Sequence, residues 1–268
     1  MAAGNGMQRW ERRVALVTGA SSGIGRATAN ALARHSMIVI GCSRNIKSIE
    51  EDGQMLSTDS SVTGALHAIK CDLRQEEEIL AMFAEIRDKY GGVDVCICNA
   101  GIAPSETRNK TVGILNGNSS KWRDMLDVNI MAVAICCREA VKQMEEKGAN
   151  DGQLFVINSM SGHRLTAINT HFYACTKHAV TALVEAIRRE LREKKNHMRI
   201  AQISPGLVET EFFQRMYPND PPAEAHKIFA KVKPLQPEDI ADNMLYILQA
   251  PPHVQIHDIL VRSTEQSF

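Results

Sequence analysis

The chain has 268 residues with 31 basic and 31 acidic side chains, and this balance without a basic run argues against general nucleic-acid binding. No stretch approaches the ~20 apolar residues of a membrane span, and the first thirteen residues lack the apolar stretch of a signal peptide, so we expect a cytoplasmic protein without a membrane span. The seven cysteines include no Cys-x-x-Cys pair, and we interpret them as small buried side chains in a reducing compartment rather than as disulfides or a metal site.

Short apolar runs alternate with amphipathic stretches along the whole chain. The apolar runs predict strands buried on both faces of a parallel sheet, at residues 14–18, 38–43, 66–71, 93–98, 154–159, 199–204 and 256–261. The amphipathic stretches predict helices at residues 25–35, 75–90, 122–147, 173–193 and 238–249. The alternation predicts an α/β fold: one doubly wound Rossmann-type domain over residues 1–268, with a parallel seven-stranded sheet and helices on both faces.

Four segments lie outside this alternation. Residues 1–13 form an N-terminal extension, and the polar, serine-rich residues 52–63 predict a surface loop. Residues 104–120 and 208–233 follow strand ends, where ligands bind in sheets of this kind. The second of these segments predicts a substrate lid, and it carries the apolar side chains Phe212, Phe213, Met216, Tyr217 and Phe229.

A glycine-rich turn, Thr18-Gly19-Ala20-Ser21-Ser22-Gly23-Ile24-Gly25, follows the first predicted strand and opens a helix. Gly19 permits a tight turn, Gly23 lets the backbone approach a pyrophosphate, and Gly25 lets the helix pack closely. The helix N-terminus offers free amides and a partial positive charge to phosphates. The turn predicts a dinucleotide site that includes Gly19, Ser21, Ser22, Gly23, Ile24 and Gly25; an ordinary glycine-rich strand–helix turn is the alternative.

The end of the second predicted strand indicates which nicotinamide cofactor binds. An acidic residue there would bind a ribose 2′-hydroxyl, whereas an arginine suits a 2′-phosphate. The strand ends at Ser43-Arg44-Asn45, so Arg44 can contact a phosphate while Ser43 and Asn45 add hydrogen bonds. Glu50 lies further on and could orient Arg44. We therefore expect NADP(H) rather than NAD(H), and a solvated surface arginine is the alternative.

Tyr173 and Lys177 lie four residues apart, which places both side chains on one face of a helix. An ammonium held near a phenol favours the phenolate and lowers a pKa that is ordinarily about 10. A tyrosine tuned in this way can exchange a proton with a carbonyl or alcohol oxygen near neutral pH. Simple packing of the tyrosine in a helix is the alternative.

Together these motifs resemble those of the short-chain dehydrogenase/reductase family, and the resemblance spans almost the whole chain. Further matches follow in the family's order, namely Asp72 with the adjacent Leu73 at the adenine, Asn99-Ala100-Gly101 beside the cofactor, Asn129 and Ser159 in the active site, and Pro205-Gly206 with Val208 and Thr210 at the nicotinamide carboxamide.

The resemblance implies four catalytic residues, Asn129, Ser159, Tyr173 and Lys177, of which Ser159 and Tyr173 contact the substrate. Tyr173 would transfer the proton, and Ser159 would donate a hydrogen bond to the substrate oxygen. Lys177 would lower the tyrosine pKa and bind the nicotinamide ribose, and Asn129 would hold a water that links Lys177 to solvent.

A closer resemblance within the family is to a group that uses NADP(H) on ketosteroids, other apolar carbonyls or isoprenoid alcohols such as farnesol. It is based on Gln8-Arg9-Trp10, residues 158–164 and 170–173, and the tail Ser263-Thr264-Glu265-Gln266. It implies an NADP(H)-dependent oxidoreductase for a small apolar carbonyl or alcohol, diketones included, that forms a homodimer or homotetramer.

Two departures from the family pattern stand out. Cys98 replaces the usual first asparagine of the Asn-Asn-Ala-Gly turn. Val261-Arg262-Ser263-Thr264 replaces the common Val-Asp-Gly-Gly, which weakens the case for tetramer packing through the last strand.

Several alternatives stay open at this point. The chain could be a catalytically silent NADP(H)-binding regulatory or scaffold protein, although an intact Ser159, Tyr173 and Lys177 disfavours this. A dehydrogenase for sugars or polar metabolites is disfavoured by the phenylalanines of the lid. His163, His171 and those phenylalanines are each either ordinary packing residues or substrate contacts.

Overall fold

Seven parallel strands form one sheet at the centre of the computed structural model, which describes residues 6–103, 114–165, 170–215 and 229–267. Their order across the sheet is β3-β2-β1-β4-β5-β6-β7, with every neighbouring pair parallel. The bounds are β1 (Val14–Thr18), β2 (Ile38–Ser43), β3 (Ala65–Lys70), β4 (Val95–Cys98), β5 (Gln153–Ile157), β6 (Arg199–Pro205) and β7 (Asp258–Val261). The order reverses between β1 and β4, where ligands bind in doubly wound sheets. The predicted seven-stranded parallel sheet is therefore confirmed.

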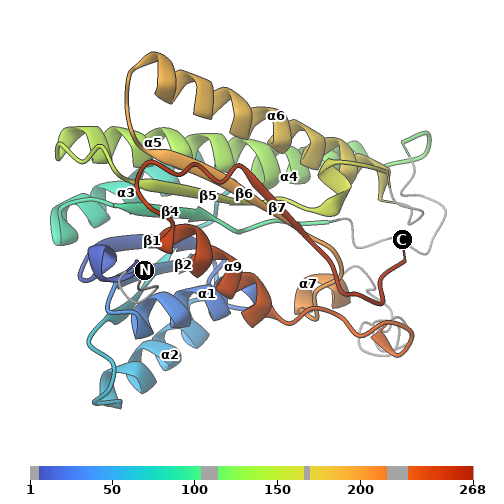
Figure 1. Cartoon of the computed structure of the whole chain (residues 1–268). Coiled ribbons are helices and arrows are strands. Elements are labelled where there is room, and N and C mark those ends of the chain that lie inside the picture. Colours follow the sequence, from blue (N-terminus) through green and yellow to red (C-terminus); the bar gives the residue numbers. More distant parts are fainter. Residues whose placement is uncertain (1–5, 104–113, 166–169, 216–228, 268) are drawn as a thin grey trace.

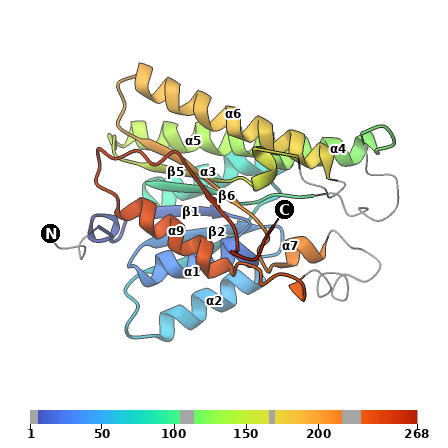
Figure 2. The same cartoon turned by 45° about the vertical axis from the view of Figure 1, so that its right-hand side comes forward.

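Helices cover both faces of the sheet (Figures 1 and 2). One face carries α3 (Glu76–Tyr90), α4 (Ser119–Leu126), α5 (Ala132–Glu146) and α6 (His171–Glu193). The other carries α1 (Gly23–Arg34), α2 (Lys47–Thr58) and α9 (Pro237–Gln249), and α7 (Glu211–Gln214) lies beyond the strand ends.

Side chains along each strand alternate between two hydrophobic cores. In β1, Val14 and Leu16 pack into the core beneath α3, α5 and α6, while Ala15 and Val17 pack into the core beneath α1 and α9. Because both faces are covered, all five β1 residues are buried. This explains why the central strands are continuous apolar runs in the sequence.

The polar segment expected to be a loop at residues 52–63 is a helix over most of its length, because α2 extends to Thr58. Asp52 is buried within α2, and its carboxylate accepts two 2.6 Å hydrogen bonds from Arg26 and one of 2.9 Å from Asn30, both on α1. A partner on another helix thus makes a polar residue suit a buried helical position, and composition alone could not reveal that partner.

The single helix expected at residues 122–147 is interrupted. A π turn, Asp127–Met131, joins α4 to α5 and carries Asn129. Such a turn inserts an extra residue into the helical ladder, and π turns often occur at functional sites.

The N-terminal segment is part of the folded core. Gln8–Trp10 forms a 3₁₀ turn, and the fully buried Trp10 donates a 2.9 Å hydrogen bond to the carbonyl oxygen of Leu248 on α9. The guanidinium groups of Arg9 and Arg13 lie 4.8 and 4.6 Å from the centre of the Trp10 ring. Trp10 therefore links the segment before β1 to the end of α9.

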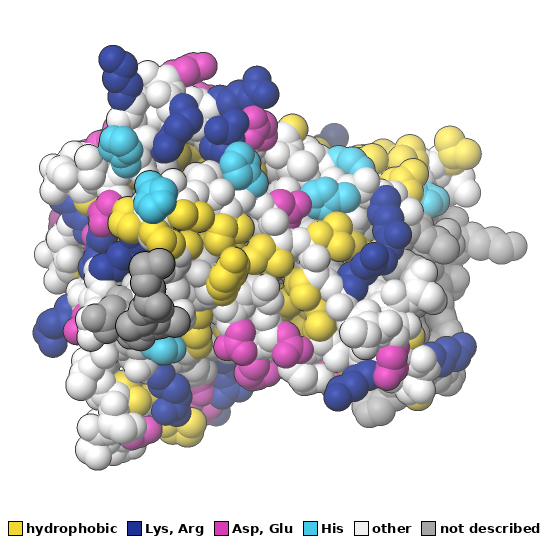
Figure 3. All heavy atoms as spheres, viewed as in Figure 1, with side chains coloured by type: hydrophobic (Ala, Val, Ile, Leu, Met, Phe, Trp, Pro, Cys, Tyr) yellow, Lys and Arg dark blue, Asp and Glu magenta, His cyan; other side chains and the backbone are white. Residues whose placement is uncertain are grey.

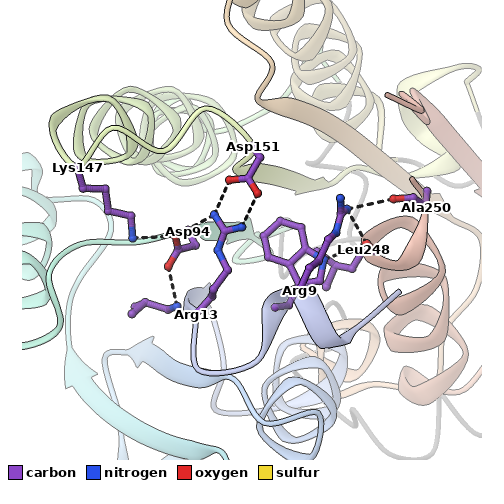
Figure 4. A network of polar contacts seen from close by, with 9 residues as sticks. Arg9, Arg13, Asp94, Lys147, Asp151, Leu248 and Ala250 are labelled. Carbon is purple, nitrogen blue, oxygen red and sulfur yellow. Dashed lines mark hydrogen bonds and ion pairs between the residues drawn. The ribbon is translucent and has the colours of Figure 1, made fainter. Parts of the chain in front are cut away.

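Arg13 also connects the segment to the sheet. Its guanidinium contacts Asp94 at 3.0 Å and Asp151 at 2.7 Å. Asp94 lies just before β4, accepts a hydrogen bond from the Val14 amide, and pairs with Lys147 at 2.8 Å (Figure 4). These contacts lie beneath the amino-terminal ends of β1, β4 and β5, at the opposite edge of the sheet from the glycine turn.

The edge strand β7 exposes apolar side chains. A band of hydrophobic atoms runs along it in Figure 3. Leu260 of β7 is 46% exposed, and Tyr246 of α9 is 63% exposed. Within the described parts of the chain, none of the helices combines the length and apolar character needed to cross a membrane.

Replacement of Trp10 by alanine is expected to lower the free energy of unfolding by about 3–5 kcal/mol, because it removes a large, fully buried ring and leaves a cavity. Urea denaturation measures this, with Met55→Ala as the control. Met55 is 64% exposed, so its replacement should change stability by no more than about 0.5 kcal/mol. Equal effects of the two replacements would contradict the packing role of Trp10.

Candidate functional site

The glycine turn after β1 has backbone conformations and contacts that require glycine. Gly19 and Gly23 have φ values of +68° and +54°, in the left-handed region that favours glycine. A Cβ atom at Gly25 would lie 2.3 Å from the Gly19 carbonyl oxygen and 2.4 Å from the Asn99 side-chain amide. Gly25 therefore permits close packing on the turn itself and on the segment after β4, rather than only on the strand.

The first turn of α1 faces a cavity, and its backbone amides donate no capping hydrogen bond to the side chain of Ser22, the N-cap residue. Ser22, Gly23 and Ile24 all line the cavity. A helix N-terminus of this kind attracts anions, because free amides and the helix dipole act in the same direction. The turn therefore fits the phosphates of a dinucleotide.

The side chain of Thr18 ties this turn to the end of β4. Its hydroxyl oxygen accepts 3.0 Å hydrogen bonds from the amides of both Asn99 and Ala100. The Asn99 side-chain amide donates in return to the Thr18 carbonyl at 2.8 Å and to the Gly19 carbonyl at 3.3 Å. The segment Asn99-Ala100-Gly101 is thus fixed beside the glycine turn, and its expected place beside the cofactor stays a prediction.

Cys98, which departs from the family pattern, lies behind this segment. Its Sγ atom is 3.9 Å from the Sγ atom of Cys137 on α5. Cys98 is buried as a free thiol, and so are the other described cysteines apart from the exposed Cys175. The thiol occupies an apolar interface between β4 and α5.

At the end of β2, Ser43 and Arg44 line the cavity. The Ser43 hydroxyl is 3.0 Å from that of Ser21 in the glycine turn, and Arg44 is exposed. Asn45 instead accepts a hydrogen bond from the Lys47 amide at the start of α2. Glu50 is exposed on α2, does not line the cavity, and makes none of the described contacts with Arg44. The geometry therefore does not support Asn45 and Glu50 as cofactor contacts.

Asp72 and Leu73 line the cavity after β3, together with Arg74, which the sequence analysis did not single out. Arg74 donates to both carboxylate oxygens of Asp72, with its Nε atom 3.0 Å from Oδ1. These side-chain hydrogen bonds lower the pKa of Asp72 to about 2. The spacing Asp-x-Arg was the available signal for this pair, because both residues lie in one short loop.

Tyr173, Ser159 and Lys177 meet in the middle of the cavity. Ser159 follows β5, and its Oγ atom accepts a 3.1 Å hydrogen bond from the Ser161 amide. Ser159 also shares a side-chain hydrogen bond with the Tyr173 hydroxyl. The Nζ atom of Lys177 lies 5.7 Å from the centre of the Tyr173 ring and donates to the Ile157 carbonyl at 2.8 Å. All three side chains line the cavity.

Burial dominates the electrostatics of this trio. It raises the pKa of Tyr173 to about 12, although the hydrogen bond with Ser159 acts in the opposite direction. It also lowers the pKa of Lys177 to about 8. Burial disfavours each charged form. The lowering of the tyrosine pKa that was expected from the ammonium therefore does not outweigh burial in this structure.

Asn129 does not line the cavity but lies directly behind it. Its side chain accepts a 2.9 Å hydrogen bond from the Ile102 amide and donates one of 2.9 Å to the Ile102 carbonyl. It also donates to the Thr176 hydroxyl at 3.1 Å. A Cβ atom at Gly101 would lie 3.6 Å from the Asn129 oxygen and 3.8 Å from Lys177 Nζ, so this asparagine secures the backbone next to the lysine.

One end of the cavity is apolar. An apolar cluster formed by Ala103, Leu207, Phe212, Phe213 and Phe229 lies beside Tyr173. The ring centres of Tyr173 and Phe212 are 6.0 Å apart. Met216 and Tyr217 of the expected lid, like residues 104–113 of the expected loop, lie outside the described residues.

His163 and His171 do not line the cavity. His163 contacts the Ser204 hydroxyl at 2.9 Å and the Asp258 carboxylate at 3.0 Å, which makes it a structural link between the Ser159 turn and the strands β6 and β7. His171 is the first residue of α6. Neither histidine contacts the space beside Tyr173.

The cavity measures about 490 Å³ and extends from the glycine turn to the apolar cluster. Pro205, Gly206, Val208 and Thr210 also line it, and their contact with the nicotinamide stays a prediction. Lys121, Asp124, Arg215 and Gln266 also line it, and sequence reasoning missed them as site residues. Lys121 and Asp124 lie on α4, Arg215 follows α7, and Gln266 lies in the tail. Among the described residues, no cluster of three His, Cys, Asp or Glu side chains could hold a metal ion.

Comparisons with known proteins identify the family. Residues 13–221 match the family described as short chain dehydrogenase. The chain is 47% identical to human dehydrogenase/reductase SDR family member 11 over 97% of this chain and 98% of that protein. It is 36% identical to farnesol dehydrogenase of Aedes aegypti over 98% of this chain and all of that protein. The chain therefore belongs to the short-chain dehydrogenase/reductase family of oxidoreductases.

Solved structures agree with the fold and with the expected cofactor. An alcohol dehydrogenase from the archaeon Thermococcus sibiricus, complexed with 5-hydroxy-NADP, matches with a TM-score of 0.78 and 25% identity. The match covers 95% of this chain and 97% of that chain.

The lowered pKa of Lys177 has a consequence for stability. Between about pH 8 and pH 10.4 the unfolded chain binds the proton more tightly than the folded chain, so this lysine makes the free energy of unfolding rise with pH. The stability of the wild type relative to Lys177→Met should therefore increase by about 2–3 kcal/mol from pH 7 to pH 10.5. Urea denaturation across this range tests it, with the exposed Lys47→Met as the control for removal of a lysine. A flat or falling difference would contradict the burial effect.

Proposed function

We propose that this chain is an NADP(H)-dependent oxidoreductase that transfers a hydride between the nicotinamide and an apolar carbonyl or alcohol. The observation that carries the proposal is the buried Tyr173 side chain, which lies in the same cavity as the glycine turn. Its hydroxyl shares a hydrogen bond with Ser159, and Lys177 lies close to its ring. Carbonyl reduction requires a proton donor and a dinucleotide-binding site in one cavity.

Three features support NADP(H) as the cofactor. Arg44 lines the cavity at the end of β2, where no acidic residue follows the strand. Ser43 and Ser21 lie next to it and can bind phosphate oxygens. A structural neighbour holds an NADP derivative. A guanidinium suits a 2′-phosphate because its donors match the geometry of the phosphate oxygens.

The reaction in the reducing direction follows from the protonation states. NADPH, when held in this cavity, would supply the hydride for the carbonyl carbon. Because burial raises the pKa of Tyr173 to about 12, its phenol carries a proton at neutral pH. As negative charge develops on the substrate oxygen, the phenolic O–H bond breaks and the proton passes to that oxygen. The Ser159 hydroxyl donates a hydrogen bond to the same oxygen, since its own oxygen is occupied by the Ser161 amide.

Lys177 would stabilise the resulting phenolate. At neutral pH a lysine with a pKa of about 8 is mostly protonated, so an ammonium lies close to the tyrosine ring. Its charge interaction with the phenolate is strong in this buried environment. Asn129 supports this arrangement by holding the backbone beside Lys177, and its expected water-holding role stays a prediction.

The apolar cluster supports an apolar substrate. Leu207, Phe212 and Phe213 line the cavity beside Tyr173 and offer few hydrogen-bonding groups to a sugar or another polar metabolite. One relative is named farnesol dehydrogenase, which names an isoprenoid alcohol. We therefore propose ketosteroids, diketones and isoprenoid alcohols such as farnesol as the substrate class.

A catalytically silent NADP(H)-binding protein is the second candidate. It would need the dinucleotide seat but not the close packing of Ser159, Tyr173 and Lys177. The expected homodimer or homotetramer stays a prediction that sedimentation velocity can test, and the exposed apolar band along β7 offers one surface for such contact.

Arg44→Ala is expected to weaken NADPH binding by about 10–100-fold, because charge-assisted hydrogen bonds to a phosphate are lost, and to leave NADH binding nearly unchanged. Titrations of protein fluorescence with each cofactor give the dissociation constants. Arg34→Ala is the matched control, because Arg34 pairs with Asp59 at 3.1 Å and lies outside the cavity. Equal wild-type affinity for both cofactors, or tighter NADH binding, would overturn the cofactor proposal.

Tyr173→Phe should keep NADPH binding and lose at least about a hundredfold in kcat, because the proton donor is removed while the ring remains. Nicotinamide absorbance with a panel of steroids, diketones and isoprenoid aldehydes measures this. Tyr90→Phe is the control, since Tyr90 lies on α3 next to His67 and away from the cavity. A wild type that binds NADPH but reduces none of the panel would favour the silent protein, and an active Tyr173→Phe would refute the mechanism.

A further inference from the structure

Gln266 is buried although it lies in none of the described helices or strands. Its exposed fraction is 7%. An amide side chain in a buried position costs free energy unless it is hydrogen-bonded. The partners of Gln266 therefore indicate what its burial achieves.

The side chain of Gln266 joins two segments that line the cavity. Its Oε1 atom accepts a 3.0 Å hydrogen bond from the Leu207 amide, in the segment that follows β6. Its Nε2 atom lies 3.1 Å from the Sδ atom of Met160, the residue after Ser159. Gln266 itself also lines the cavity. One side chain thus spans from the proposed nicotinamide segment to the turn that carries Ser159.

The sequence of the segment after β6 accommodates this contact. A Cβ atom at Gly206 would lie 2.2 Å from the Gln266 Oε1 atom, closer than any real contact. Gly206 is absent from the glycines with positive φ, so its backbone conformation does not by itself demand glycine. The same Cβ atom would lie 2.8 Å from Arg262 Cγ, so close approach of Gln266 and Arg262 together is a physical reason for glycine at this position.

Neighbouring bonds hold the same segment from other directions. The Gly206 amide donates to the Val261 carbonyl at 2.8 Å, and the Glu209 amide donates to the Leu235 carbonyl at 2.8 Å. Between them, the Leu207 amide is held by the Gln266 side chain. Glu265, the residue before Gln266, accepts a 2.8 Å hydrogen bond from the Lys233 amide. The tail therefore contacts the segment after β6 and also the residues around Lys233. The latter lead to Leu235, which forms a β-bridge with Val208.

We propose that Gln266 is a positioning residue, which sets the separation between the segment after β6 and the Ser159 turn. This inference rests on the proposed function, in which the first segment lies against the nicotinamide and the second against the substrate oxygen. Hydride transfer requires the reacting atoms to be held about 3–3.5 Å apart, and a misplacement of about 1 Å can cost on the order of 100-fold in rate. The C-terminal tail is therefore part of the active-site framework.

The test compares two ways of breaking this contact with a matched control. Gln266→Met keeps the length of the side chain and removes the acceptor for the Leu207 amide. Gly206→Ala keeps Gln266 and inserts a methyl group where its oxygen lies. Gln143→Met is the control, because Gln143 is also buried and also bridges two backbone groups, accepting from the Val93 amide and donating to the Phe83 carbonyl far from the cavity.

We expect Gln266→Met and Gly206→Ala to lower kcat by about 10–100-fold, and Gln266→Met to change the NADPH dissociation constant by less than about threefold. Gln143→Met should lower Tm at least as much and leave kcat within about twofold. Hydrogen exchange of peptides covering residues 205–210 should speed up in the first two variants and not in the control. This exchange is measured without turnover, so it reports on the contact itself.

The outcomes separate the two proposals. If the wild type turns over and Gln266→Met and Gly206→Ala retain wild-type kcat, or lose it only in proportion to Tm as the control does, Gln266 has no positioning role while the proposed function stands. If the wild type reduces no member of the carbonyl panel, the proposed function fails and the role of Gln266 in it fails as well. Should Gln266→Met not fold, Gly206→Ala and its exchange pattern decide the question.

Discussion

The hydroxyl of Thr18 is the contact on which the site depends most. It accepts hydrogen bonds from the amides of both Asn99 and Ala100. These bonds join the end of β1 to the end of β4, where the strand order reverses. Parallel strands end at the same edge of the sheet, but that alone does not fix the loops above them. The Thr18 and Asn99 bonds hold the glycine turn against the segment that leads to Gly101, and Gly101 in turn lies next to Lys177. The glycine turn and the side chain of Lys177 are thereby positioned by one connected stretch of backbone contacts.

Within that framework, burial sets the chemistry. Tyr173 and Lys177 are removed from water, which disfavours both phenolate and ammonium and leaves a neutral phenol beside a lysine whose pKa is near 8. A phenol that keeps its proton at neutral pH cannot act as a ready-made base. It releases the proton when negative charge develops on a neighbouring oxygen, because the same low dielectric then strengthens the interaction between the new phenolate and the ammonium. The arrangement is suited to proton donation during carbonyl reduction, and oxidation of an alcohol requires the phenolate to be formed first.

The parts of the structure that could be predicted from sequence are those set by local patterns. Strand positions follow from continuous apolar runs, the glycine turn from its spacing, and the shared face of Tyr173 and Lys177 from four-residue periodicity. The helix α2 could not be predicted because the partner of Asp52 is Arg26 on another helix. The π turn at Asn129 has no local signature, and the pKa of Tyr173 depends on burial, which the spacing to Lys177 does not reveal. Gln266 joins the site through contacts more than fifty residues away in the sequence.

The two ends of the cavity are therefore built in different ways. The dinucleotide end is formed by backbone geometry within short stretches, where Gly19, Gly23 and Gly25 leave little freedom. The end beside Tyr173 is assembled by side chains from separate parts of the chain, namely the Ser159 turn, the segment after β6 and the C-terminal tail. Side-chain contacts between distant segments hold each segment less firmly than a glycine turn holds itself, since each contact must offset the ordering of both partners. The buried Gln266 offsets this weakness, because its side-chain amide contacts both the segment after β6 and the Ser159 turn. The shape of the end beside Tyr173 then depends on tertiary contacts, while the shape of the glycine-turn end depends on local backbone geometry.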